Sequence, residues 1–208
     1  MHKRIFPWRT TKQPYEILIA EILLHRTKAI QVVPVYLNFI KEFPNIPTLL
    51  SVPTEYIEQI THTLGLNWRA KMIKQMAEVI AKKYKGEIPM DKNELLSLPG
   101  IGNYIASAFL CFTSNICEPL LDTNTVRILG RVFCIPVTDS SRRMTNFKST
   151  YISLCSKDNP RDFGFAMIDL AAQVCLSGKP LCETCPVLQF CSFGIRKTGE
   201  KYESETCY

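Results

Sequence analysis

Several common features are missing from this chain of 208 residues, and each absence removes a class of protein. No stretch approaches the ~18 uninterrupted apolar residues of a membrane-spanning helix. The opening residues, MHKRIFPWRTTKQPYE, lack the apolar segment of a secretion signal, so we expect an intracellular protein. Alternating β-branched residues are nearly absent, and no internal repeat or low-complexity stretch occurs. These absences leave a soluble helical protein that does not use a membrane.

Apolar residues recur with helical spacing along nearly the whole chain. The predicted helices are residues 14–28, 29–43, 54–64, 69–84, 91–97, 103–114, 123–134, 141–156 and 160–175. We expect Pro44 and Pro47 to break the chain between the second and third of these helices. The predicted fold class is therefore all-α. The net charge of +6 and the pI of 8.8 are compatible with a phosphate-bearing partner.

Nine cysteines without a secretion signal indicate a reducing compartment and a metal centre in place of a disulfide framework. Four of them are separated by six, two and five residues: Cys175, Cys182, Cys185 and Cys191. Soft sulfur ligands select iron–sulfur clusters or zinc, but this spacing differs from the paired hooks of a zinc ribbon. The other five show no second pattern, and we expect most to be small buried apolar residues: Cys111, Cys117, Cys134, Cys155 and Cys207.

A second motif is the Leu98-Pro-Gly-Ile-Gly102 turn between two predicted helices. Gly100 and Gly102 allow a tight turn that exposes backbone amides, while Ile101 is expected to anchor the turn in the core. Because the next helix begins here, its free N–H groups and positive dipole end form a seat for a phosphate. A plain connection between two helices is the alternative interpretation.

The third motif, Leu120-Leu-Asp-Thr-Asn-Thr-Val-Arg127, places Asp122 eighteen residues after Tyr104. Taken alone, Asp122 is an ordinary N-cap of the helix that follows it. A carboxylate can also stabilise an oxocarbenium-like sugar or activate an attacking water molecule. Both interpretations stay open at this point.

Together the cysteine loop, the glycine turn and Asp122 resemble the helix-hairpin-helix DNA glycosylases of the endonuclease III and MutY superfamily. The resemblance extends to residues 6–9, 14–27 and 165–172, and so covers nearly the whole chain. It implies that the four cysteines hold one [4Fe–4S] cluster. It also implies that Asp122 is catalytic and that Asn124 lies in or supports the base pocket.

The architecture implied by the resemblance has two helical lobes with the active site in the cleft between them. Residues 16–117 are expected to form a six-helix barrel that contains the helix-hairpin-helix. Residues 1–15 and 118–208 are expected to form the iron–sulfur cluster domain. The implied partner is double-stranded DNA with a mismatched or damaged base. We expect a monomer in the cytoplasm or nucleoid of a prokaryote.

Two features select a branch within the superfamily. MutY-type enzymes carry a C-terminal domain that reads 8-oxoguanine, and only seventeen residues follow Cys191 here, so we expect that domain to be absent. MutY-like chains also tend to have two glutamines where this chain has His25-Arg26. The prediction is removal of thymine or uracil opposite guanine, as in the mismatch-type glycosylases. Glu21 matches the acidic residue of the base pocket and is expected to relay a proton to the leaving base, unless it lies on a solvated edge.

Removal of a base requires that its nucleotide leave the stack and that the gap be filled. His25 or Arg26 is expected to fill the gap, and the 66–69 segment is expected to supply a second wedge. Asn67 and Trp68 are the candidates there, although Trp68 is equally a core candidate. Candidate phosphate contacts are Arg69, Lys71 and Lys74, although charges of this kind are usually only the solvated face of a helix. The alternative functions are a MutY-like adenine glycosylase, a catalytically silent lesion-binding module and a helical zinc protein.

The residue at position 104 generates a first prediction. Bifunctional relatives have a lysine there that forms a Schiff base with the sugar, and a tyrosine cannot form that imine. We expect the protein to leave an intact abasic strand that breaks only after alkali treatment. Efficient borohydride trapping of the wild-type protein on DNA would contradict this prediction.

Overall fold

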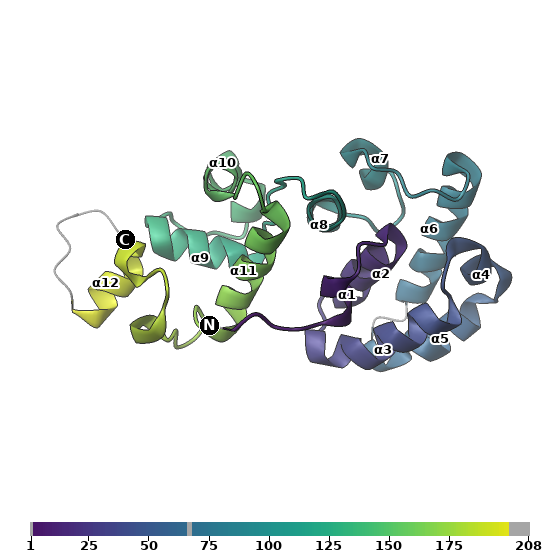
Figure 1. Ribbon diagram of the computed structural model, residues 1–208, viewed down its shortest axis with the longest axis horizontal. Coiled ribbons are helices and arrows are strands. Elements are labelled where there is room, and N and C mark those ends of the chain that lie inside the picture. The colour runs from purple at the N-terminus through teal and green to yellow at the C-terminus, as the bar shows by residue number, and fades with distance from the viewer. Residues whose placement is uncertain (1, 66–67, 200–208) are drawn as a thin grey trace. The chain divides into compact units, whose positions relative to one another are not determined.

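The computed structural model describes residues 2–65 and 68–199. In that part of the chain all regular elements are helices and no strand occurs, which confirms the all-α prediction. The chain divides into two compact units (Figure 1). We call residues 5–114 the hairpin unit, and residues 2–4 with 115–199 the cysteine unit. No helix within the described ranges has the length and apolar character needed to cross a membrane.

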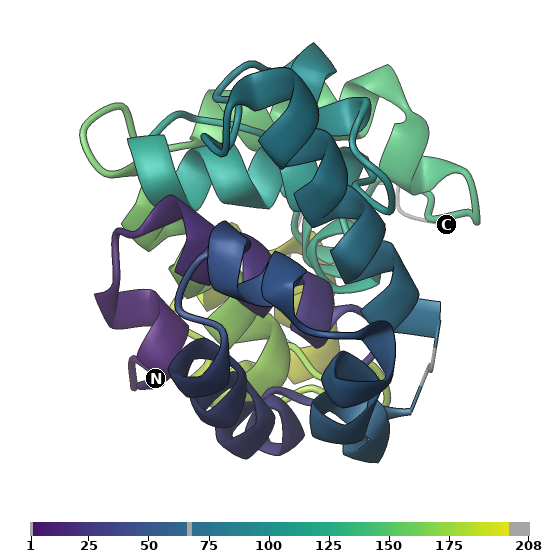
Figure 2. The ribbon, with the colours of Figure 1, turned by 90° about the vertical axis from the view of Figure 1, so that its right-hand side faces the viewer.

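The described residues of the hairpin unit form eight α-helices and one 3-10 turn. Figure 2 shows these helices in purple, blue and teal. Their bounds are α1 Pro7–Thr10, α2 Pro14–Leu24, α3 Ala29–Glu42, α4 Ile46–Ser51, α5 Thr54–Thr61, a 3-10 turn His62–Leu64, α6 Trp68–Tyr84, α7 Lys92–Leu96 and α8 Asn103–Ser114. Helix α2 is the centre of the unit, because every residue from Ile17 to Leu23 is buried and the helix contacts α1, α3 and α8. A helix that is apolar on all sides is stable only when neighbours cover it.

The cysteine unit has four α-helices and three 3-10 turns. They are α9 Thr123–Phe133, a 3-10 turn Ser141–Arg143, α10 Thr145–Leu154, α11 Pro160–Gln173, 3-10 turns Cys182–Thr184 and Leu188–Phe190, and α12 Ser192–Thr198. Helix α9 contacts α10, α11 and α12 and so organises the unit. The N-terminal residues join it through an ion pair between Arg4 and Asp169 of α11, with Nε and Oδ1 2.6 Å apart.

The division differs from the expected one at both ends of the hairpin unit: residues 5–15 cluster with it, and residues 115–117 cluster with the cysteine unit. For residues 5–15 the reason lies in the packing of two aromatic side chains. The ring of Trp8 stacks on Phe6 at 5.0 Å between centroids and meets the edge of Tyr36 in α3 at 5.4 Å. Offset or edge-on aromatic pairs of this kind add to the free energy gained from burial.

Nearly all predicted helices are present, but three short ones were missed: α1, α4 and α12. Pro47 does not break the chain, because it lies in the first turn of α4, where a missing N–H costs nothing. Asn45 caps this helix by accepting a hydrogen bond from the Thr48 amide at 2.9 Å. The predicted helix 141–156 is divided into a 3-10 turn and α10.

The structure contains a disulfide, although a metal centre was expected in place of a disulfide framework. Cys117, in the segment before α9, is bonded to Cys155 at the C-terminal end of α10. Cys134 also takes part in a disulfide, whereas Cys111 is outside any disulfide and is buried as expected. Cys207 lies outside the described residues. No spacing pattern reveals the Cys117–Cys155 pair, because 38 positions separate its members and only tertiary packing brings them together.

This disulfide generates a stability prediction. Closing a loop of this length restricts the unfolded chain and should contribute about 4 kcal/mol to the free energy of unfolding. We expect Cys155→Ser to lower the urea midpoint under non-reducing conditions. Wild-type protein treated with a reductant is the control, and its midpoint should fall at least as far as that of the variant, because the reductant also breaks the bond of Cys134. Equal midpoints for oxidised wild type and variant would show that the bond does not stabilise the fold.

Candidate functional site

Asp122 is the N-cap of α9, and both of its carboxylate oxygens are held by hydrogen bonds. Oδ1 accepts a bond from the Thr125 amide at 2.7 Å, and Oδ2 accepts one from Asn124 Nδ2 at 2.8 Å. The side chain is half-buried. The N-cap interpretation is therefore confirmed, and it does not compete with a catalytic role, because the cap fixes the orientation of the carboxylate.

Hydrogen bonds connect Asp122 to the cysteine loop through Asn124 and Arg127. Asn124 Oδ1 accepts a bond from Arg127 Nη1 at 3.0 Å. The same guanidinium donates from Nε and Nη2 to the carbonyl oxygen of Cys175, at 3.0 and 2.9 Å. Arg127 was not among the predicted site residues. Its position on α9, four residues before Arg131, indicates that both arginines share one helix face.

Arg131 lies one turn further along α9 and contacts the same loop. Its Nη1 donates to the carbonyl of Leu176 at 2.7 Å and approaches the Cys175 sulfur at 3.4 Å. Its guanidinium carbon lies 4.9 Å from the centre of the Phe193 ring. Residues four apart share one face of a helix, so both arginines of α9 hold the cysteine loop.

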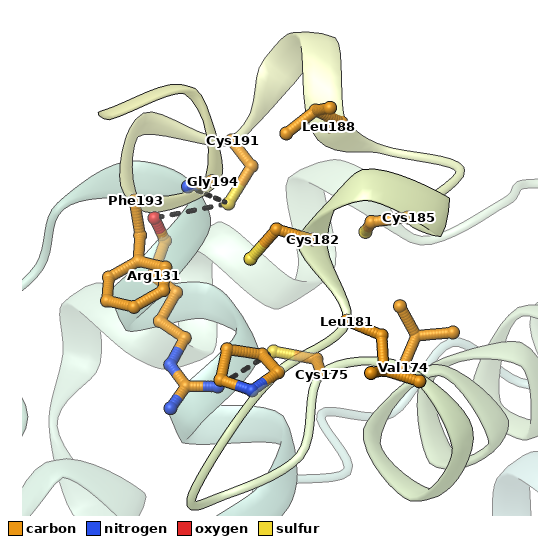
Figure 3. A pocket seen from close by; sticks show the side chains of 11 residues that line it. Arg131, Val174, Cys175, Leu181, Cys182, Cys185, Leu188, Cys191, Phe193 and Gly194 are labelled. Carbon is orange, nitrogen blue, oxygen red and sulfur yellow. Dashed lines mark hydrogen bonds between the residues drawn. The ribbon is translucent and has the colours of Figure 1, made fainter. Parts of the chain in front are cut away.

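All four cysteines of the 6-2-5 motif line one pocket together with Arg131 (Figure 3). The pocket has about 280 Å³ of empty space, which includes open solvent. Cys175 follows α11, Cys182 and Cys185 flank a 3-10 turn, and Cys191 is the N-cap of α12. The sulfur of Cys191 accepts a bond from the Gly194 amide at 3.3 Å. Burial raises the pKa of the Cys185 and Cys191 thiols, so both are protonated at neutral pH when no metal is bound.

Within residues 2–65 and 68–199, no three His, Cys, Asp or Glu side chains converge closely enough to hold a single metal ion. A tetrahedral zinc site requires such convergence. A [4Fe–4S] cluster does not, since each thiolate binds a different iron atom. The pocket is lined by four thiols, and a backbone N–H group and a guanidinium donate to two of their sulfur atoms. This donor set fits a [4Fe–4S] cluster better than a single metal ion.

The predicted phosphate seat lies between α7 and α8. Gly100 has a φ of +77°, which a side chain would strain, and Ile101 is buried at 6 % exposure as predicted. Gly102 is exposed, and a Cβ added there would meet nothing within 4 Å. A group from outside the chain can therefore approach the backbone where α8 begins. Tyr104, in the first turn of α8, is half-buried.

Glu21 is buried in α2 at 6 % exposure, among apolar residues of the same helix. The alternative of a solvated edge is therefore wrong. A carboxyl group in such surroundings is costly unless it has partners or a task. Glu21 and Tyr104 belong to the hairpin unit, whereas Asp122 and Asn124 belong to the cysteine unit.

His25 and Arg26 form an exposed turn between α2 and α3. Arg26 adopts a left-handed conformation with φ of 59°, which is uncommon for a residue with a side chain. The Trp68 ring meets the edge of His25 at 6.3 Å and is 48 % exposed, so Trp68 is not a core residue. Partial burial and the charges of Arg26 and Arg69 lower the pKa of His25, which is neutral at pH 7. Asn67 lies outside the described residues.

Two of the three candidate phosphate contacts were wrong. Arg69 has no exposed surface, and its Nη2 donates to the His25 carbonyl and to Thr27 Oγ1. Lys74 donates to the carbonyls of Leu49 and Leu50 at the end of α4 and to that of Val52 just beyond it. Lys71 alone is exposed. Sequence could not separate the three, because all are basic residues of one helix and their partners come from other segments.

A known protein family matches the part of the chain that contains most of these candidate residues. A sequence model described as HhH-GPD superfamily base excision DNA repair protein matches residues 19–152. The chain belongs to this superfamily. Its match includes Glu21, the 98–102 turn and Asp122, and it ends before the cysteine loop.

Individual relatives of this HhH-GPD protein carry more specific names. A thymine-DNA glycosylase of Aeropyrum pernix is 39% identical over 192 residues, which are 90% of this chain and 86% of that protein. The solved structure of a thermostable thymine-DNA glycosylase is similar with a TM-score of 0.85 and 32% identity, covering 93% of this chain and 89% of that one. An adenine DNA glycosylase of Buchnera aphidicola is 35% identical over 91% of this chain but only 54% of its own length.

Proposed function

We propose that this protein is a monofunctional DNA glycosylase that removes thymine or uracil mispaired with guanine. The observation that carries the proposal is the similarity to a thymine-DNA glycosylase over most of both chains. The basic turn His25-Arg26 and the tyrosine at position 104 support it. Since the relatives named above are prokaryotic, we place the protein at a prokaryotic nucleoid, where it acts as a monomer on double-stranded DNA.

In this proposal Asp122 acts on the sugar. The bond between C1′ and the base breaks with its electrons leaving on the base, and positive charge develops on the sugar. A fixed carboxylate stabilises that charge, and water then bonds to C1′ and loses a proton. Asn124 and the Thr125 amide hold the carboxylate in place, so no reorganisation is needed during the reaction.

Glu21 is assigned to the leaving base. A base that departs with an electron pair needs a proton, and a buried carboxyl group can deliver or relay one. Tyr104 is assigned a position near the sugar without a covalent role, because its hydroxyl cannot form an imine. Hydrolysis alone therefore completes the reaction in this proposal.

DNA is held at three places in this proposal. The turn of Gly100, Ile101 and Gly102 seats a backbone phosphate at the start of α8, without reading sequence. His25 or Arg26 fills the gap left by the extruded nucleotide. Asn67 and Trp68 serve as the second wedge, a role that the exposure of Trp68 supports.

The four cysteines, we propose further, hold a [4Fe–4S] cluster, and the domain built around it corresponds to the cysteine unit. The group supplies a structural cross-link when bound. Arg131 offsets the negative charge of four thiolates and donates toward the Cys175 sulfur. Arg127 bonds to the carbonyl of the same cysteine, so an ordered loop also orders Asn124 and Asp122.

Adenine removal opposite 8-oxoguanine or guanine is the second candidate function. The 35% identity to an adenine DNA glycosylase favours it. The match covers 54% of that enzyme, whereas it covers 86% of the thymine-DNA glycosylase. A duplex panel with G·T, G·U, A·8-oxoguanine, A·G and thymine glycol, each with and without alkali, separates the two candidates. Faster release of adenine than of thymine would select the second.

The cluster assignment predicts a brown protein with about four iron atoms per chain. Cys182→Ser should lose the visible absorption and lower the stability of the cysteine unit, because metal binding contributes to folding free energy. Cys155→Ser is the matched control, since it removes a cysteine outside the pocket and should keep the iron. A colourless protein purified anaerobically with zinc bound would contradict the assignment.

The mechanism predicts different outcomes for two substitutions of Asp122. Asp122→Asn removes the charge but keeps an effective N-cap, so excision should fall ~10²–10³-fold while stability changes little. Asp122→Ala should also lower the free energy of unfolding by about 1 kcal/mol. Glu21→Gln should slow excision as well. Single-turnover kinetics on G·T duplexes and urea titrations provide the measurements, and undiminished excision by Asp122→Asn would remove this residue from the mechanism.

A further inference from the structure

Arg69 is the largest fully buried side chain of the described residues, and it is a cation. It lies at the second position of α6, with no exposed surface. Its Nε and Nη1 have no hydrogen-bond partner among residues 2–65 and 68–199. Neither the Lys3–Asp162 nor the Arg4–Asp169 ion pair involves Arg69, and no carboxylate of the described residues pairs with its guanidinium.

A buried guanidinium in this state is unfavourable for folding. Removing a charge from water costs several kcal/mol, and two donors without partners forfeit further hydrogen bonds. Burial lowers the pKa of Arg69, which reflects the same cost. An apolar residue of similar length would avoid it. Arg69 therefore needs an explanation other than the stability of the hairpin unit.

Both bonds that Arg69 does form end on the turn between α2 and α3. Its Nη2 donates to the carbonyl of His25 and, at 2.8 Å, to Thr27 Oγ1. These two acceptors flank Arg26, whose left-handed backbone is unfavourable for a residue with a side chain. The guanidinium thus holds the turn on both sides of its least favourable residue.

We propose that Arg69 is a positioning residue that fixes the His25–Thr27 turn so that Arg26 is presented to the DNA helix in one conformation. This inference rests on the proposed function, in which His25 or Arg26 fills the gap left by the extruded nucleotide. Of these two residues it selects Arg26. A turn fixed in advance loses less conformational entropy when it enters DNA. Arg69 acts only through the turn and does not itself touch DNA.

The decisive variant is Arg69→Met, whose unbranched side chain is shorter than that of arginine and has neither its charge nor its donors. We expect the dissociation constant for a G·T duplex to rise roughly 10- to 100-fold, the range for charge-assisted hydrogen bonds. The urea midpoint should be unchanged or higher, since replacing a buried charge by an apolar group is often neutral or stabilising. A purely structural role predicts the opposite change in stability.

Lys74→Met is the matched control. Lys74 is another inward-facing cation of α6, but its three bonds end on carbonyls at and just after the end of α4. Its removal should lower the urea midpoint and leave the affinity for the duplex unchanged. Thr27→Val serves as a milder variant that removes only one of the two bonds, and it should weaken binding by a smaller factor.

A double-mutant cycle with Arg26→Ala tests whether Arg69 influences DNA binding through Arg26. If Arg69 acts through Arg26, Arg69→Met should have little further effect on binding when Arg26 is already absent. Wild-type affinity of both Arg69→Met and Thr27→Val, or additive losses in the cycle, would overturn the proposal. The test measures DNA binding and not base removal. A wild-type protein that binds the duplex but does not remove a base would contradict the proposed function, and the binding of the variants could still be compared.

Discussion

The hydrogen bonds of Arg127 are the interaction on which the candidate site depends. One guanidinium joins Asn124, which holds Asp122, to the carbonyl of Cys175 at the edge of the cysteine pocket. Helix α9 therefore carries a carboxylate at its N-terminus and the support of the cysteine loop along its side. The orientation of Asp122 and the order of the loop are linked through side chains of a single helix, with Arg131 adding a second attachment one turn later.

Three acidic or basic side chains are buried in the described part of the chain, and each has a different explanation. Asp169 is paired with Arg4 and attaches the N-terminal residues to the cysteine unit. Glu21 lies within the most apolar helix, where the proposed reaction needs a proton source. Arg69 lacks a carboxylate partner in the described ranges and stabilises a turn whose central residue is left-handed. Burial of charge is unfavourable in all three cases, which is why their contacts are informative.

The cysteines are used in two chemically distinct ways. Four are free and line one pocket, while Cys117 and Cys155 form a disulfide that closes a loop containing Asp122 and α9. The bond restricts the unfolded chain around the segment that carries the carboxylate. A disulfide in a small unit compensates for a limited apolar core.

The sequence by itself determined the helical class, most helix positions, the 98–102 turn and the cysteine loop, because these depend on local periodicity and spacing. Ile101 was correctly assigned to the core for the same reason. Only the tertiary structure decided the pairing of Cys117 with Cys155, the roles of Arg69 and Lys74 and the connection from Asp122 to Cys175. Each of these depends on which distant backbone groups lie beside a long side chain. Sequence specifies that an arginine or lysine carries donors, but packing alone selects the carbonyl that accepts them.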